Sequence, residues 1–179
     1  MKKPRTALKR TPFKNKARPS GIAHQSKPRE GRARKKPDPN SPYQLKKADN
    51  RWSKVVREKA DYKCLFCGRS GRDYNPDTGI PYVTNAHHMI PKGVSKFYRH
   101  NINNGICLCF YCHKHHEEWS PHANKTGFWK KLKKVAPVEY RWYMKRKDEV
   151  HPSVKVNYKQ VASVMQDILD GKLLGEEEE

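Results

Sequence analysis

Two short cysteine motifs decide the fold of this chain. The segments CLFC (residues 64–67) and CFYC (residues 109–112) share the CxxC spacing and supply four thiols, those of Cys64, Cys67, Cys109 and Cys112. Two cysteines at this spacing on a tight turn can direct both thiolates at one ion, and two such pairs complete the tetrahedral sulfur site that zinc prefers. The four thiols therefore predict a structural zinc site, with a dithiol redox pair or unligated cysteines as the alternatives.

The two pairs are separated by residues 68–108, which is too long a gap for a simple zinc finger. We therefore expect the pairs to clamp an intervening element, and the zinc to supply folding free energy that a small polar domain cannot obtain from its core. The fifth cysteine, Cys107, lies between Ile106 and Leu108. A lone cysteine in an apolar run is most often a small buried hydrophobe, so we expect Cys107 in the core.

Histidines lie inside the clamped segment and directly after it. His87 and His88 follow a β-prone run that begins at Tyr82, and His113 follows the second cysteine pair. We expect a strand that arrives at His87 and a helix whose first residue is His113. Adjacent residues of a strand point to opposite faces, so one imidazole can hold a metal while its neighbour reaches another reactant. A metal held by His87 and His113 could polarise a phosphodiester, and His88 could deprotonate the attacking water.

The charge of the chain is concentrated at its N-terminus. The 179 residues include 39 Lys and Arg against 18 Asp and Glu, for a net charge of +21, and residues 1–36 hold 14 of the basic residues against one acid, Glu30. Mobile cations near a polyanion release condensed counterions, which favours nucleic-acid contact over a merely solubilising tail. Because no apolar run approaches the ~18 residues of a membrane helix, and none follows the basic start, we expect a cytoplasmic protein without membrane contact.

Patterning divides the chain into five parts. Residues 1–42 are expected to be a disordered basic arm, and residues 43–60 a lead-in helix with Trp52 on its apolar face. Residues 61–120 form the expected core. Residues 121–174 form a helical extension, with one helix over 125–134 and another near the C-terminus, and residues 175–179 form an acidic tail. In the extension we expect three aromatic residues to be core rather than base-stacking groups, namely Phe128, Trp129 and Trp142.

The motifs occur in the order CLFC, AHHMIP, NGICLC, CFYCH, which resembles the HNH endonucleases over roughly residues 60–119. The resemblance implies an α+β fold with a small ββα-metal (His-Me finger) core and a structural zinc. It implies that His87 on the strand and His113 on the helix hold a divalent metal, and that His88 is the general base. Asn104 has the spacing of the family's Asn, which braces the loop bearing the base or helps complete the metal site.

The chain departs from the family pattern at one position. Many members have another His four residues after the position of His113, where this chain has Glu117, with His116 one residue earlier as the nearest substitute. The segment SKFYRHNINNGICLCFYC (residues 95–112) is also similar to phage recombination endonucleases of the NinG/Rap type, which are associated with branched DNA. This similarity implies a phage-encoded enzyme that acts in the cytoplasm of a bacterial host.

We therefore expect a metal-dependent HNH endonuclease that hydrolyses DNA, branched or nicked DNA included. It would hold structural Zn²⁺ and a catalytic ion, Mg²⁺ or Mn²⁺, with Ni²⁺ or a second Zn²⁺ as alternatives because imidazole suits several ions. Lys92, Lys96 and Arg99 lie in the loop between the histidine pair and Asn104 and are candidate phosphate contacts, unless that loop is simply solvated. Two alternatives stay open. One is a zinc-ribbon-like nucleic-acid-binding protein that cuts no bond, and the other is a nuclease or chaperone directed at RNA.

Overall fold

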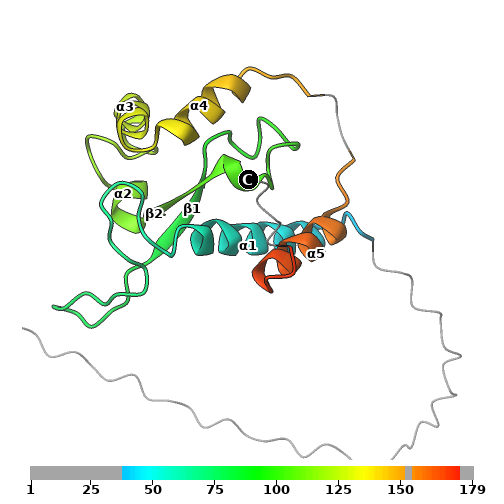
Figure 1. The fold of residues 1–179 in the computed structure, drawn as a ribbon, viewed down its shortest axis with the longest axis horizontal. Helices are drawn as coiled ribbons and strands as arrows, with labels where there is room; N and C mark the ends of the chain where they lie inside the picture. Colours follow the sequence, from blue (N-terminus) through cyan, green and yellow to red (C-terminus); the bar gives the residue numbers. More distant parts are fainter. Residues whose placement is uncertain (1–37, 152–154, 174–179) are drawn as a thin grey trace, which may run out of the picture. The chain divides into compact units, whose positions relative to one another are not determined.

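The computed structural model describes residues 38–151 and 155–173, which fold as an α+β unit of helices and one two-stranded antiparallel sheet (Figure 1). The predicted acidic tail and all but the last residues of the predicted basic arm lie outside this range. The elements in chain order are α1 (Pro42–Lys59), β1 (Thr84–His88), the 3-10 helix η1 (Ile102–Asn104), β2 (Gly105–Cys109), α2 (Phe110–Lys114), α3 (Lys125–Val135), α4 (Pro137–Arg146) and α5 (Tyr158–Leu169).

Helix α1 is the expected lead-in helix. Ser41 caps it by accepting a hydrogen bond from the Gln44 N–H, and Pro42 occupies the first turn, where no backbone donor is lost. The helix ends before Asp61 and Tyr62, which both have positive φ. Its buried face includes Trp52 and packs against α5, which lies beside it in Figure 1.

Strands β1 and β2 pair so that His87 is opposite Ile106 and His88 is opposite Gly105. Gly105 is required for the packing of α1, because a Cβ there would lie 2.8 Å from Cζ2 of Trp52 and closer still to Val56. Figure 1 shows the sheet between the α1–α5 pair and the α3–α4 pair. The histidine strand is therefore covered by a different helix pair on each side.

Helix α2 follows β2 without a loop. The prediction that it begins at His113 was wrong, because the helix begins at Phe110 and His113 is its fourth residue. Cys109 is the N-cap, and its sulfur accepts a hydrogen bond from the Cys112 N–H at 3.4 Å. The second cysteine pair is thus part of the helix start, and His113 is the next residue of the same turn.

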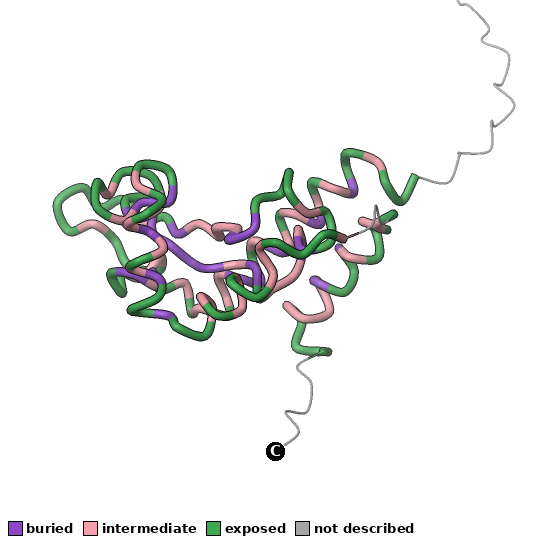
Figure 2. The backbone as a smooth tube through the Cα atoms, turned by 90° about the horizontal axis from the view of Figure 1, so that it is seen from above, coloured by how far each residue is buried: buried purple, intermediate pink, exposed green. Residues whose placement is uncertain are grey.

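Buried side chains form two clusters, one on each side of the sheet. The larger contains the buried cysteines of the CxxC motifs and the apolar faces of β2 and α3, and the smaller joins α1 to α5 through Trp52 and Met165. In Figure 2 a buried stretch of backbone, in purple, runs through the interior of the unit. Strand β2 is buried from Ile106 to Cys109. Phe128 is fully buried as expected, whereas Trp129 and Trp142 are only partly buried.

The expected helices over 125–134 and near the C-terminus are present as α3 and α5, but α4 was not predicted. Pro137 follows the end of the predicted 125–134 helix, and a proline at such a place is normally a helix stop. It ends α3 and also occupies the first turn of α4, the helical position that proline tolerates best. Within the described ranges, no helix has both the length and the apolar character needed to cross a membrane.

Candidate functional site

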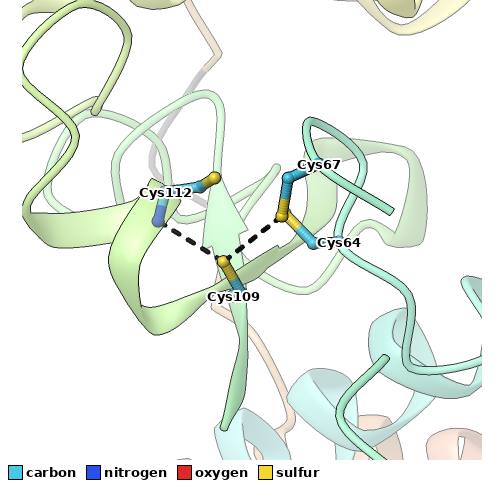
Figure 3. Close-up of side chains that lie close together, drawn as sticks. All are labelled: Cys64, Cys67, Cys109 and Cys112. Carbon is cyan, nitrogen blue, oxygen red and sulfur yellow. Dashed lines mark hydrogen bonds between the residues drawn. The ribbon is translucent and has the colours of Figure 1, made fainter. Parts of the chain in front are cut away.

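The four CxxC thiols converge on one point (Figure 3). Their sulfur atoms all lie within 4.8 Å of one another, and Sγ of Cys67 is 3.7 Å from Sγ of Cys109. In tetrahedral zinc–thiolate sites the Zn–S distance of about 2.3 Å places neighbouring sulfurs about 3.8 Å apart. The cluster therefore has the donor set and the spacing to hold a metal ion such as zinc.

The sulfurs in this cluster perturb one another electrostatically. A hydrogen bond from Cys109 lowers the pKa of Cys64, and the same bond raises the pKa of the Cys109 thiol, while burial raises the pKa of Cys112. A divalent cation would relieve the repulsion that keeps the four thiols from ionising together. Cys107 lies outside the cluster, and its side chain is buried as expected.

A second cluster consists of three imidazoles. Nδ1 of His87 lies 3.1 Å from Nε2 of His113, which in turn lies 3.2 Å from Nε2 of His122. Ligand nitrogens about 2.1 Å from one ion would be about 3.0–3.4 Å apart in octahedral or tetrahedral geometry. The three nitrogens therefore fit one metal ion, and three protein ligands leave a coordination position for water or substrate.

The environment of this cluster keeps the imidazoles neutral, which is the metal-binding form. Burial lowers the pKa of His87 to about 3 and that of His113 to about 4, and the neighbouring His122 and Lys114 reinforce both shifts. Burial also lowers the pKa of His122.

His122 is the ligand candidate that the sequence did not reveal. The expected substitute, His116, instead stacks on Trp119 with ring centroids 3.4 Å apart, and Glu117 is exposed. A turn around Ser120 returns the chain to α2, because its hydroxyl donates to the His113 carbonyl and accepts from the His122 N–H. The spacing of nine residues matches no helical period, so only this turn brings His122 to His113.

The side chain of His88 projects from the face of β1 opposite to the imidazole cluster. Its Nε2 lies 2.8 Å from the carbonyl oxygen of Arg99, which can only accept, so Nε2 carries the proton and Nδ1 is the basic nitrogen. The ring stacks on the indole of Trp52 from α1. Burial lowers the pKa of His88 to about 4, although the hydrogen bond to Arg99 opposes this effect. The imidazole is thus held in one tautomer and one plane.

Asn104 braces the loop that follows the histidine pair. Its side chain is fully buried, accepts from the Ile90 N–H at 2.7 Å, and donates to the carbonyl oxygens of Ile90 and Tyr98. These bonds occupy both ends of the amide. Of the two roles implied by the resemblance, the geometry therefore matches loop bracing and not metal ligation.

The expected phosphate contacts differ in their surroundings. Arg99, one of the candidate phosphate contacts, makes two hydrogen bonds to Asp49 through its guanidinium, at 2.9 and 2.7 Å, which tie the side chain to α1. Burial alone would raise the pKa of Asp49, but hydrogen bonds from Arg99 and His100 hold it well below its usual range. Lys92 is half exposed, 3.4 Å from Asp49, and Lys96 is exposed.

A cavity of about 580 Å³ lies beside the imidazole cluster and is lined by both members of the histidine pair, His87 and His88. Its charged lining residues other than histidine are Lys92, Lys114 and Lys125, with no carboxylate among them. The two residues thus border one space although their side chains leave the strand on opposite faces. A positively charged cavity of this kind favours an anionic ligand.

Comparisons of the chain with protein-family models, with curated proteins and with solved structures find no match. What the site can do therefore follows from its own residues and their geometry.

Proposed function

We propose that this protein is a metal-dependent endonuclease of the HNH type that hydrolyses phosphodiester bonds in DNA. The observation that carries the proposal is the division of labour on β1. His87 joins the imidazole cluster, and the next residue, His88, lines the same cavity and has its Nε2 fixed by the Arg99 carbonyl. One group that binds a metal and one that accepts a proton thus flank a single cationic space.

The arrangement of the elements supports the same proposal. Two antiparallel strands lead directly into α2, and the helix carries His113 to the histidine strand, as a ββα-metal core requires. The cysteine cluster includes Cys109 at the end of β2 and Cys112 in α2. We infer that a structural zinc there would fix the angle between β2 and α2, and with it the position of His113.

The chain's own residues would divide the reaction as follows. A divalent ion held by His87, His113 and His122 would stabilise negative charge on the phosphate and on the leaving oxygen. Nδ1 of His88 would take a proton from the attacking water, because its Nε2–H is already donated to Arg99. Lys92, at the cavity wall, would neutralise non-bridging phosphate oxygens.

The three imidazoles of the cluster help to choose among the catalytic ions that the sequence left open, which were Mg²⁺, Mn²⁺, Ni²⁺ and a second Zn²⁺. Mg²⁺ prefers oxygen ligands, whereas imidazole suits zinc, nickel, copper and iron. The cluster consists of three imidazoles, and the cavity lining includes no carboxylate. We therefore propose a transition-metal ion at this site.

The proposal is tested with protein that carries zinc only at the cysteine cluster. Supercoiled plasmid and a synthetic four-way junction are incubated with Zn²⁺, Ni²⁺, Mn²⁺ or Mg²⁺, or with no added ion, and products are resolved on gels. We expect nicked or linear product that requires an added ion. Binding without cleavage under every ion would contradict the proposal and favour the non-catalytic zinc-ribbon-like alternative. Cleavage of the junction alone would identify a branched-DNA enzyme.

A further inference from the structure

Helix α3 carries an uncompensated positive charge. It contains five lysines and no acidic residue, and none of the five takes part in an ion pair within the described parts of the chain; they are Lys125, Lys130, Lys131, Lys133 and Lys134. Lys131 lies over the ring of Trp119, and the other four are exposed.

Several basic side chains elsewhere are neutralised by nearby acids. Lys54 pairs with Glu58 on α1, Arg72 pairs with Asp61 after that helix, and Arg99 pairs with Asp49. Carboxylates thus lie beside cations at several places in the described unit but beside none of the five lysines of α3. A cationic surface that the chain leaves without partners is suited to an external polyanion.

The lysines of α3 are continuous with the proposed active site. Lys125 and Trp129 line the same cavity as the imidazole cluster, and Lys133 is one further turn along the same stripe of the helix. Each four-residue step advances about 6 Å along the axis, so Lys125 and Lys133 are about 12 Å apart. The stripe thus leads out of the cavity, with Lys130 and Lys134 exposed on the outer side of the helix.

We propose that α3 binds the phosphate backbone of the nucleic-acid strand whose scissile phosphate enters the histidine cavity. The assignment of the strand rests on the proposed function, and the binding itself does not require cleavage. A membrane surface fits less well, because the apolar face of α3 is already occupied: Phe128 and Leu132 are buried in the core.

The test compares two triple variants with equal loss of charge. The first replaces α3 lysines that do not line the cavity (Lys130→Gln, Lys133→Gln, Lys134→Gln). The matched control replaces exposed lysines of α1 and of the segment at the start of α5 (Lys46→Gln, Lys155→Gln, Lys159→Gln). Fluorescence anisotropy with labelled duplex DNA, without a catalytic ion, gives the affinity at several NaCl concentrations.

Affinity falls with salt, and each lost phosphate contact reduces the steepness of log affinity against log salt, the absolute value of the slope, by about 0.9. We expect the α3 variant to reduce this slope by about 2 to 3 and the control to leave it within about 0.5 of the wild type. Equal reductions in both variants, or none in the α3 variant, would overturn the proposal. So would equal displacement of the DNA by polyglutamate of the same charge concentration, which would mark α3 as a general anion surface.

Cleavage is then measured separately for the same proteins. A slope shift in a protein that cuts no DNA would uphold the α3 surface and contradict the nuclease proposal. Metal-dependent cleavage by a protein whose slope is unchanged in the α3 variant would support the nuclease proposal and contradict the α3 surface.

Discussion

The imidazole of His88 stacks on the indole of Trp52, with ring centroids 3.7 Å apart and an interplanar angle of 20°. Trp52 is itself fixed, because its indole N–H donates to the Asn101 carbonyl at 2.9 Å. One helical turn earlier, Asp49 binds the guanidinium of Arg99, whose backbone carbonyl accepts a hydrogen bond from Nε2 of His88. Helix α1 precedes the cysteine and histidine motifs in the sequence. It nevertheless positions the proposed general base, through the Trp52 ring and through the Asp49–Arg99 pair.

Loss of the Trp52 ring is expected to impair the reaction more than binding. Trp52→Leu should lower kcat by about tenfold to a hundredfold with little change in KM, because His88 loses the plane that orients it. Trp52→Phe, which keeps an aromatic face, should restore most of the activity. Steady-state cleavage kinetics check both. Val56→Ala, at another buried position of α1, controls for general destabilisation, and an unaltered kcat in folded Trp52→Leu would contradict the role.

Acid should weaken the Asp49–Arg99 clamp. The pKa of Asp49 is lower in the folded protein than in the unfolded chain, so its ionised form stabilises the fold above the unfolded pKa of about 3.9, and this stability is lost as pH falls further. Asp49→Asn should cost about 1–3 kcal/mol of unfolding free energy at pH 7. In urea titrations this difference should shrink below pH 4. A difference that is constant from pH 3 to pH 7 would show that the charge of Asp49 contributes nothing.

The cysteine cluster should bind one zinc ion per chain. Replacing one of its thiols, as in Cys112→Ser, is expected to remove most of the bound zinc and to lower thermal stability, because binding free energy at such a site is also folding free energy. Cys107→Ala should keep the full zinc content, since Cys107 is outside the cluster. Metal analysis with circular dichroism distinguishes the two variants. Full zinc occupancy in Cys112→Ser would rule out the four-sulfur site.

His122 should be a ligand of the second metal. Removal of residues that merely orient ligands costs about 10- to 100-fold in metal affinity, so His122→Ala should weaken Zn²⁺ or Ni²⁺ binding by at least about 100-fold. His116→Ala should have no effect, because that ring stacks on Trp119 instead. Calorimetric titration of protein with its cysteine site already filled gives both affinities. A loss of affinity in His116→Ala with unchanged affinity in His122→Ala would show that His116, the substitute expected from sequence, is the ligand, and equal affinities in the two variants would contradict the role of His122.

The sequence predicted those parts of the site that depend on local spacing. The CxxC pairs indicated a four-thiol cluster, and the positions of His87 and His113 indicated two residues that would meet, because these motifs are carried by the two strands and the helix after them. Helical periodicity also placed Trp52 on a buried face, although a period cannot tell which residue it will contact.

What sequence reasoning missed depends on contacts between distant segments. His122 joins the cluster through a turn held by Ser120, and Arg99 is neutralised by Asp49, which lies 50 residues earlier in the chain. The sequence alone does not show whether a basic loop residue is exposed to solvent or paired with an acid on another helix or strand. Helix α4 was missed because Pro137 both ends one helix and begins the next.

The proposed role of His88 is tested most directly by the initial rate of plasmid nicking. Wild type, His88→Ala and His115→Ala are compared under the ion that supports most cleavage, with His115 chosen because it is exposed and outside both clusters. General-base catalysis contributes about 10²- to 10⁴-fold, so His88→Ala should lose activity by that factor while His115→Ala keeps the wild-type rate. Wild-type nicking by metal-loaded His88→Ala would contradict the account.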